Sequence, residues 1–452
     1  MESLGSTHKK QNDNKDDDII SKLPDSVIGH ILSFLPTKYA VRTSVLSKRW
    51  IESWTLIPKV NLDDSLFYSP KRKKSVGKQY FINFVYKTLL FTQNYSMQSF
   101  SLLISNNYDL TLLNTWISCI LKKGVKKLSI ISNLELPFSA LTSHALFNHC
   151  NALEELTLWM CCCAIKVPPS PFGYFIFGSL EVLKLDGIIF TIDESLVIHL
   201  SKLKKFETKR CSWLSAHDVT IEAPLLESVF IQDVREPLSC KIKFSASCIK
   251  EFTYCGYGSM SQPIVLSNSS ATRNASVDIY LSNNGSSHFH ETRPCVFLLL
   301  KQFSQVKWLK FHILVVIDQP NVVVLPKFSM LSDLDLACVS GKVLLVLLQK
   351  TPVINTLVLK DISSIDQELL NSAVVPDCLA SSLQVVKFEF VNCDQHELLL
   401  AKYFMENGRV LERMSFSIRF SVVFSSKVIE EFKEELYSFK KGVSSAILEF
   451  DD

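Results

Sequence analysis

The stretch "LEELTL", Leu153 to Leu158, carries apolar residues at its first, fourth and sixth positions, with mostly polar residues between them. Alternation over its last three positions is typical of a β-strand that buries one face. The same frame returns as "LEVLKL" at Leu180, "LESVFI" at Leu226 and "VKWLKF" at Val306. A frame that recurs along the chain in this way indicates a repeat architecture.

Further copies extend the repeat over most of the chain. Good or partial copies begin at Met97, Val125, Leu203, Ile249, Leu331, Ile354, Leu383 and Leu411, with a poor match at Ser276. With Ser276 counted as one turn, successive copies start 23 to 30 residues apart. This interval is at or near that of leucine-rich repeats, about 20–29 residues, whose motif continues to an Asn or Cys. Asn133, Cys161 and Cys211 occupy that position in three copies.

The repeat predicts an α/β fold in which a leucine-rich-repeat solenoid carries a parallel β-sheet on its concave face. One coil cannot bury its own apolar residues, but stacked coils share one continuous core. A mixed α/β domain with evenly spaced strands is the alternative. The predicted organisation is a disordered polar tail (1–18), a helical unit (19–58), a linker and first helix (59–96), irregular repeats (97–370) and C-terminal repeats with a cap (371–452).

An insert at about 256–300 is rich in Ser, Asn and Gly and interrupts the repeat. It fits either a flexible loop or two degenerate coils that carry an exposed insertion. We favour the two coils.

The stretch "SKLPDSVIGHILSFLPTKYAVRTSVLSKRWIESW", residues 21–54, predicts helices with more apolar surface than they can bury. Apolar residues at i, i+3, i+4 and i+7 form one stripe of a first helix: Ile28, Ile31, Leu32 and Leu35. Asp25 or Ser26 is expected to cap this helix, and Pro36 to end it.

Thr37 is expected to cap a second helix, which continues to Trp54. It carries two apolar rows, Val41 with Val45 and Leu46 with Trp50 and Trp54. One row can pack on the first helix, and the other needs a different surface. A unit of about 40 residues is too small to be stable on its own core. We therefore expect it to dock on the solenoid, on another protein, or on both.

Two stretches resemble known families. "LPDSVIGHILSFLP" from Leu23, followed by "AVRTSVLSKRW" from Ala40, closely resembles the F-box. "CLASSLQVVKFEFVNCDQHELLLAKYFMENGRVLERMSF", Cys378 to Phe416, resembles the FBD region of plant F-box/leucine-rich-repeat proteins. F-box, irregular repeats and FBD-like region occur here in the family's order, so the resemblance covers most of the chain.

The resemblance implies that the chain is the substrate-recognition subunit of a Skp–cullin–F-box ubiquitin ligase. In that family the F-box docks on a Skp-type adaptor, and through it on a cullin–RING ligase. Carried over by position, the adaptor-binding residues are Leu23, Pro24, Ile28, Ile31, Leu35, Pro36, Val45, Leu46 and Trp50. The alternative is a binding scaffold outside any ligase, whose F-box-like helices only cap the solenoid. A small-molecule receptor would need a pocket that the sequence does not show.

An unknown target protein is expected on the solvent side of the strands. The candidate contacts are Trp159, Lys184, Lys205, Glu207, Phe230 and Trp308. Aromatic residues are frequent anchors of protein interfaces. An ordinary solvated strand face is the alternative at each of these positions.

Composition argues against several other classes of function. A formal net charge of +3 gives no broad positive field for nucleic acid. No apolar run reaches the ~18 residues that span a bilayer, and no signal peptide opens the chain. We expect an intracellular protein of the nucleus or the cytoplasm, not a secreted or membrane protein. "KRKK", Lys71 to Lys74, fits a nuclear-import signal or a basic connecting loop.

The sequence contains no catalytic motif of the GxSxG, P-loop, HExxH or GxGxxG type, so we expect no enzyme. We also expect no cofactor and no metal. His144 and His149 have a spacing known from zinc sites, but no C-x2–4-C pair accompanies them. The thirteen cysteines are expected to be free thiols, most of them buried.

Overall fold

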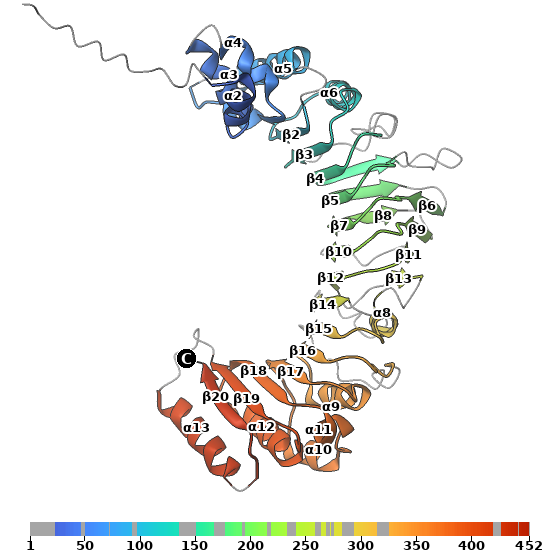
Figure 1. Cartoon of the computed structure of the whole chain (residues 1–452), viewed down its shortest axis with the longest axis vertical. Helices are drawn as coiled ribbons and strands as arrows, with labels where there is room; N and C mark the ends of the chain where they lie inside the picture. The colour runs from blue at the N-terminus through green and yellow to red at the C-terminus, as the bar shows by residue number, and fades with distance from the viewer. Residues whose placement is uncertain are drawn as a thin grey trace, which may run out of the picture. The chain divides into compact units, whose positions relative to one another are not determined.

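The computed structural model describes the chain from Leu23 to Asp451 with gaps, and its helices and strands are labelled in Figure 1. The described residues are 23–46, 50–71, 73–92, 97–134, 151–166, 177–191, 195–214, 218–232, 241–257, 264–267, 272, 275–282, 293–313, 325–418, 426–441 and 443–451. The predicted tail at 1–18 lies outside them. The chain divides into two compact units, Met1–Phe100 and Ser101–Asp452, here called unit 1 and unit 2.

Unit 1 is mainly helical. Its elements are α2 (Asp25–Leu32), α3 (Thr37–Arg42), η1 (Thr43–Val45), α4 (Trp50–Ser53), η2 (Trp54–Leu56), β1 (Lys59–Asp63), η3 (Asp64–Phe67) and α5 (Lys74–Phe91). The prediction of one helix from residue 37 to 54 is wrong, because η1 interrupts it. At the break the Thr43 hydroxyl donates to the Ala40 carbonyl at 2.6 Å, a local bond that competes with regular helix geometry.

The expected helix caps also differ from those observed. Pro24 stands at the N-cap of α2 and Pro36 at that of α3, and neither makes a side-chain cap hydrogen bond. The Thr37 hydroxyl instead accepts from the Asn61 backbone N–H of β1 at 2.7 Å. This bond ties the helices of unit 1 to its strand.

The core of unit 1 lies between these helices, β1 and α5. Ile28, Leu32 and Ala40 are fully or almost fully buried, as are the α5 residues Phe81 and Val85. The short helical segment therefore shares its core with α5, which lies outside it.

Unit 2 is built on one long parallel sheet. From β3 onward its order is β3 (Lys127–Ser132), β4 (Glu155–Lys166), β5 (Val182–Thr191), β7 (Lys205–Lys209), β10 (Ser228–Gln232), β12 (Glu251–Tyr257), β14 (Ser276–Ser282), β15 (Trp308–Ile313), β16 (Asp333–Ala337), β17 (Thr356–Lys360), β18 (Val385–Val391), β19 (Arg413–Ile418) and β20 (Ile447–Asp451). Each strand pairs in parallel with the next. The division between the units falls within β2 (Ser99–Ile104).

The repeat frame accounts for this sheet. All three apolar anchors of the coil that starts at Leu153 are buried, and the same holds for the coils that start at Leu226, Ile249 and Ile354. Buried anchors at the same positions of successive coils make one continuous core. The prediction of N-terminal helices followed by a parallel-strand solenoid is therefore confirmed.

The return segments of the coils change along unit 2. The helix α6 (Leu110–Lys122) comes first, followed by a second parallel sheet of β6 (Leu196–His199), β9 (Asp218–Glu222), β11 (Lys241–Ser245) and β13 (Ile264–Leu266). Helices then return: α8 (Arg293–Gln302), α9 (Gly341–Lys350), α10 (Gln367–Ser372), α11 (Asp377–Ser381), α12 (Gln395–Asn407) and α13 (Ser426–Lys440). A short further strand, β8 (Ser212–Leu214), pairs with β5.

Coil length explains part of this change. A strand advances about 3.3 Å per residue and a helix only about 1.5 Å, so a short return segment spans a coil better when extended. The coils that start at Leu180, Leu203 and Leu226 are 23 residues long and return through strands. The coil that starts at Leu331 is equally short but contains α9.

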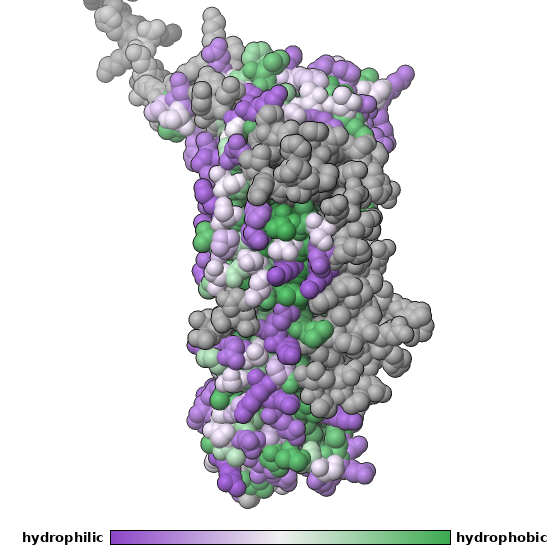
Figure 2. Space-filling view, turned by 90° about the vertical axis from the view of Figure 1, so that its right-hand side faces the viewer, coloured by the Kyte–Doolittle hydropathy of each residue, from purple (hydrophilic) through white to green (hydrophobic). Residues whose placement is uncertain are grey.

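Figure 2 faces the side of unit 2 that carries the return segments, where the coloured residues of unit 2 are a mixture of hydrophilic and hydrophobic ones.

The predicted insert at 256–300 contains regular elements of both sheets. The poor match at Ser276 is β14, which pairs with β12 and β15. β13 belongs to the second sheet. Residues 258–263 and 283–292 lie outside the described residues.

The last three strands are joined by a stack of phenylalanines. The Phe388 and Phe416 rings lie 4.9 Å apart at 6°, and those of Phe416 and Phe450 lie 5.1 Å apart at 16°. Phe432 of α13 packs its edge on Phe416 at 5.8 Å. Phe416 is fully buried at the centre of this stack, so the end of the solenoid depends on it.

We predict that Phe416→Ala lowers the free energy of unfolding by about 3–5 kcal/mol, because it removes a buried ring and leaves a cavity. Urea denaturation of the full chain, followed by circular dichroism, measures the change. Ser415→Ala on the open face of the same strand is the control and should cost less than about 0.5 kcal/mol. Equal losses for the two variants would contradict the proposed importance of the stack.

A capping box begins α12. Asp394 accepts from the Glu397 backbone N–H at 3.0 Å, and the Glu397 carboxylate accepts from the backbone N–H groups of Asn392 and Asp394. Burial raises the pKa of Glu397 to about 7, although these backbone N–H groups favour the charged form. Glu397 therefore binds its proton more tightly in the folded chain than in the unfolded chain.

This pKa predicts a pH dependence of stability. Because the folded-state pKa is raised, the contribution of Glu397 is fully present below its ordinary value of 4.5 and is lost as pH rises through about 7. Wild type should thus gain about 1–3 kcal/mol relative to Glu397→Gln as pH falls from about 8 to about 5. Urea unfolding of both proteins across this range measures the difference.

The control for this prediction is Glu406→Gln, which changes an exposed carboxylate on the same helix. The pH dependence should be larger for Glu397→Gln, because only the Glu397 carboxylate is buried. Equal pH dependence for the two variants would contradict the raised pKa of Glu397.

Candidate functional site

Unit 1 exposes a set of large apolar side chains between residues 27 and 46, which we call the apolar ridge. Its members are Val27, Ile31, Phe34, Leu35, Tyr39, Val45 and Leu46. Val45 is 87% exposed, Phe34 76% and Leu46 67%. Single exposed apolar residues are normal on a protein surface, but seven within one short helical segment are typical of an interaction site.

The helix α2 shows why this surface remains uncovered. Ile28 and Leu32, four residues apart, point into the core of unit 1. Ile31 and Leu35, which the sequence places on the same stripe, are 44% and 38% exposed. The apolar stripe is therefore wider than the core that it covers, and its outer row forms part of the ridge.

The nine predicted adaptor-binding residues fall into three groups. Pro24, Ile31, Leu35, Pro36, Val45 and Leu46 are exposed, and Leu23 is half-buried. Ile28 and Trp50 are 0% and 8% exposed. At these two positions the structure differs from the prediction of a surface contact, because both side chains belong to the core of unit 1.

Sequence reasoning missed three members of the ridge, Val27, Phe34 and Tyr39. Phe34 lies three residues after Ile31, and Val27 four residues before it, which is the spacing of one helix face. This spacing indicates a second, outer row of apolar residues on the first helix. Ser47 to Arg49, also part of the F-box-like motif, lie outside the described residues.

The predicted target-binding residues lie on the open face of the large sheet. Trp159 and Trp308 are exposed, and Lys184, Lys205, Glu207 and Phe230 are half-buried. Strand register brings Lys184, Glu207 and Phe230 into one row across β5, β7 and β10. Trp308 lies apart from them on β15.

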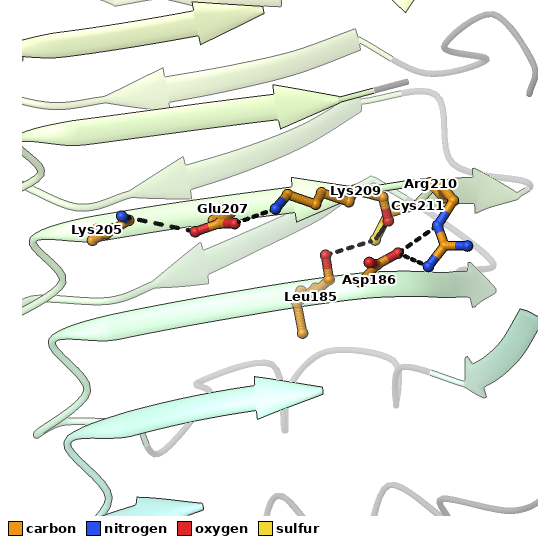
Figure 3. Close-up of polar contacts among 7 residues, drawn as sticks. All are labelled: Leu185, Asp186, Lys205, Glu207, Lys209, Arg210 and Cys211. Carbon is orange, nitrogen blue, oxygen red and sulfur yellow. Dashed lines mark hydrogen bonds and ion pairs between the residues drawn. The ribbon is translucent and has the colours of Figure 1, made fainter. Parts of the chain in front are cut away.

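Ion pairs order this face around β7 (Figure 3). The Glu207 carboxylate lies 2.9 Å from the Lys209 amine and 3.8 Å from that of Lys205. Burial opposes the charge of Glu207, but the hydrogen bond and the charge of Lys209, with two further lysines, lower its pKa below the ordinary value. The Lys209 amine also lies 5.2 Å from the centre of the Phe230 ring. These contacts hold Lys205, Glu207 and Lys209 in position along β7.

Arg210 follows β7 in a left-handed conformation, with φ of 50°. Its guanidinium reaches the Asp186 carboxylate of β5 with Nη2 at 2.6 Å and Nε at 2.7 Å (Figure 3). The next residue, Cys211, is buried, and its thiol donates to the Leu185 carbonyl at 3.5 Å. Cys211 thus joins two coils at the Asn/Cys position of the repeat.

A second polar cluster spans β15 to β18. Asp335 lies 3.0 Å from both His312 and Lys360, and Lys360 lies 3.0 Å from Glu389. Burial opposes the charge of Asp335, but hydrogen bonds from His312 and Lys360 outweigh it and lower its pKa. On the neighbouring β14, burial raises the pKa of Asp278. The open face therefore carries fixed charges of both signs.

Two further findings concern metal sites and membrane-spanning helices. Over the described part of the chain, no three His, Cys, Asp or Glu side chains are arranged to hold a metal ion. His144 and His149 lie outside the described residues. The helices described here also include none that is both long and apolar enough to cross a bilayer.

Two parts of the chain match known family models. Residues 20–59 match the F-box domain and residues 371–416 match the FBD. An F-box/FBD/LRR-repeat protein of Arabidopsis thaliana is 28% identical over 463 residues, which cover 96% of this chain and 95% of that protein. The chain resembles F-box/FBD/LRR-repeat proteins. The resemblance stated from the sequence is thereby confirmed.

Other Arabidopsis thaliana proteins match shorter parts. A second F-box/FBD/LRR-repeat protein is 32% identical over 232 residues, half of each chain. An F-box/LRR-repeat protein is 40% identical over 121 residues, 27% of this chain and 32% of that protein. The apolar ridge lies within the F-box match, and Phe388 and Phe416 lie within the FBD match.

We predict opposite effects on stability for two substitutions within the F-box match. Leu46→Asp should change the free energy of unfolding by no more than about 0.5 kcal/mol, because Leu46 is exposed. Ile28→Asp should cost about 3 kcal/mol or more, because it buries a carboxylate without a partner. Urea denaturation of the full chain compares the two. A large loss for Leu46→Asp would show that the chain itself covers the ridge.

Proposed function

We propose that this chain is the substrate-recognition subunit of a Skp–cullin–F-box ubiquitin ligase. The observation that carries the proposal is the apolar ridge, which lies within the residues that match the F-box. The names of the similar Arabidopsis proteins, which combine F-box, FBD and LRR-repeat, support the same role.

The F-box would bind a Skp-type adaptor through the exposed members of the ridge. Burial of apolar side chains is the main source of affinity in such a contact, at about 25 cal/mol per Å² of apolar area. Phe34, Val45 and Leu46 offer large exposed fractions. Ile28 and Trp50 would act indirectly, because they hold the helices that present the ridge.

The solenoid would hold a target protein on its open sheet face. Trp159, Trp308 and the row of Lys184, Glu207 and Phe230 are the proposed contacts, with Lys205 beside them. The chain would catalyse no reaction itself. It would instead raise the effective concentration of target lysines near the ubiquitin-charged enzyme.

A scaffold outside any ligase is the second candidate. The observation in its favour is that the F-box helices pack on β1, where the bond between Thr37 and Asn61 joins them. Helices that cover the first strand would cap the sheet in any protein of this kind. Adaptor binding separates the two functions.

We predict that a purified Skp-type adaptor binds the wild-type chain and binds Leu35→Asp/Leu46→Asp at least about tenfold more weakly. Both side chains are exposed, so their replacement removes apolar contacts while the fold is kept. The matched control, Trp159→Ala/Trp308→Ala, changes the open sheet face and should keep adaptor binding. Equal binding by wild type and the ridge variant in a pull-down would exclude the ligase role.

A further inference from the structure

The open face of β16 to β20 contains a groove of about 600 Å³. Strand register explains its shape. Ser415 and Ser417 of β19 lie between longer side chains on both sides, Lys387 and Glu389 on β18 and Glu449 and Asp451 on β20. Two small residues between two longer pairs leave a trough along β19. We call it the serine groove.

Carboxylates outnumber cations in the lining of this groove. Asp333, Glu389, Glu449 and Asp451 face Lys387 and Arg413. Arg413 lies 3.4 Å from Glu449, and Glu389 lies 3.0 Å from Lys360 just outside the groove. When Lys360 is counted with the lining, four carboxylates face three cations, and the net charge of the groove is −1. This charge lies where the strands have their carboxyl ends, in the row of Glu389, Ser417 and Asp451.

An aromatic side chain stands at the same end. Phe390 lies between Glu389 and Val391, where the pairing register of β18 with β19 shifts. A β-bulge of this kind changes the direction in which a side chain points. Phe390 lines the groove and is 47% exposed. An aromatic ring beside two carboxylates is an arrangement that binds the cation of a Lys or Arg side chain.

We propose that the serine groove binds an extended segment of the target protein that carries Lys or Arg side chains, with one cation held by Glu389, Asp451 and Phe390. The inference rests on the proposed function, because it names the kind of target that the solenoid selects. In an extended segment, alternate side chains face the same way about 7 Å apart, which matches the spacing of the Ser415 and Ser417 rows. The negative lining favours this partner over nucleic acid or an anionic membrane.

Fluorescence anisotropy with the full chain at low salt tests the proposal. The probes are labelled peptides of Gly and Ser with Arg at three alternate positions, and matched peptides with Gln or Glu instead. Wild type should bind the Arg peptide about five- to tenfold more tightly than the Gln peptide, and the Glu peptide more weakly still. No preference for Arg, or a preference for Glu, would overturn the proposal.

Variants locate the binding. Glu389→Gln/Asp451→Asn should abolish the preference for Arg, whereas Glu154→Gln/Glu227→Gln should keep it, because these half-buried carboxylates lie outside the groove. Ser417→Trp fills the trough without a change of charge and should also abolish binding. An Arg preference that survives both groove variants would overturn the proposal.

Adaptor binding by the same groove variants separates this inference from the proposed function. It should equal that of wild type, because the substitutions lie in unit 2 and leave the ridge unchanged. A failed peptide test with intact adaptor binding would remove the groove proposal alone. Failed adaptor binding by wild type would remove the ligase role on which it rests.

Discussion

The structure of unit 2 depends on one constraint: no coil can cover its own apolar anchors. Most coils have three apolar anchors, such as Leu153, Leu156 and Leu158, and they are buried only because coils stack on both sides. The parallel sheet follows from this stacking, since each strand must lie beside the same strand of the next coil. The anchors leave alternate side chains on the open face, where they are available to a partner.

The helices of unit 1 within the F-box match follow the opposite rule. They share a core with β1 and α5, in which Ile28, Leu32 and Trp50 are buried, yet they keep an outer row of apolar residues exposed. Surface of this kind favours association with another protein. The two units thus offer different surfaces, an apolar ridge in one and a patterned polar sheet face in the other.

The repeat frame allowed most strands of the large sheet to be predicted from sequence, because successive coils place their anchors at similar positions. The second sheet of β6, β9, β11 and β13 was not predicted, since its short strands lie outside the frame. Periodicity could not separate the inner and outer rows of α2, since Ile28 and Ile31 occupy one apolar stripe. It also could not predict the break at Thr43, where a side-chain hydrogen bond competes with the helix. The serine groove depends on which residues meet across β18, β19 and β20, and strand register decides that.

The proposed function requires that the apolar ridge is open in the free chain and becomes covered by a Skp-type adaptor. Hydroxyl-radical footprinting of the full chain, with and without a purified Skp-type adaptor, tests it at single side chains. We expect Phe34 and Leu46 to be oxidised readily in the free chain and to be protected when the adaptor is added, while Trp159 and Trp308 stay unchanged. Protection of Phe34 and Leu46 in the free chain, or no change on addition of the adaptor, would contradict it.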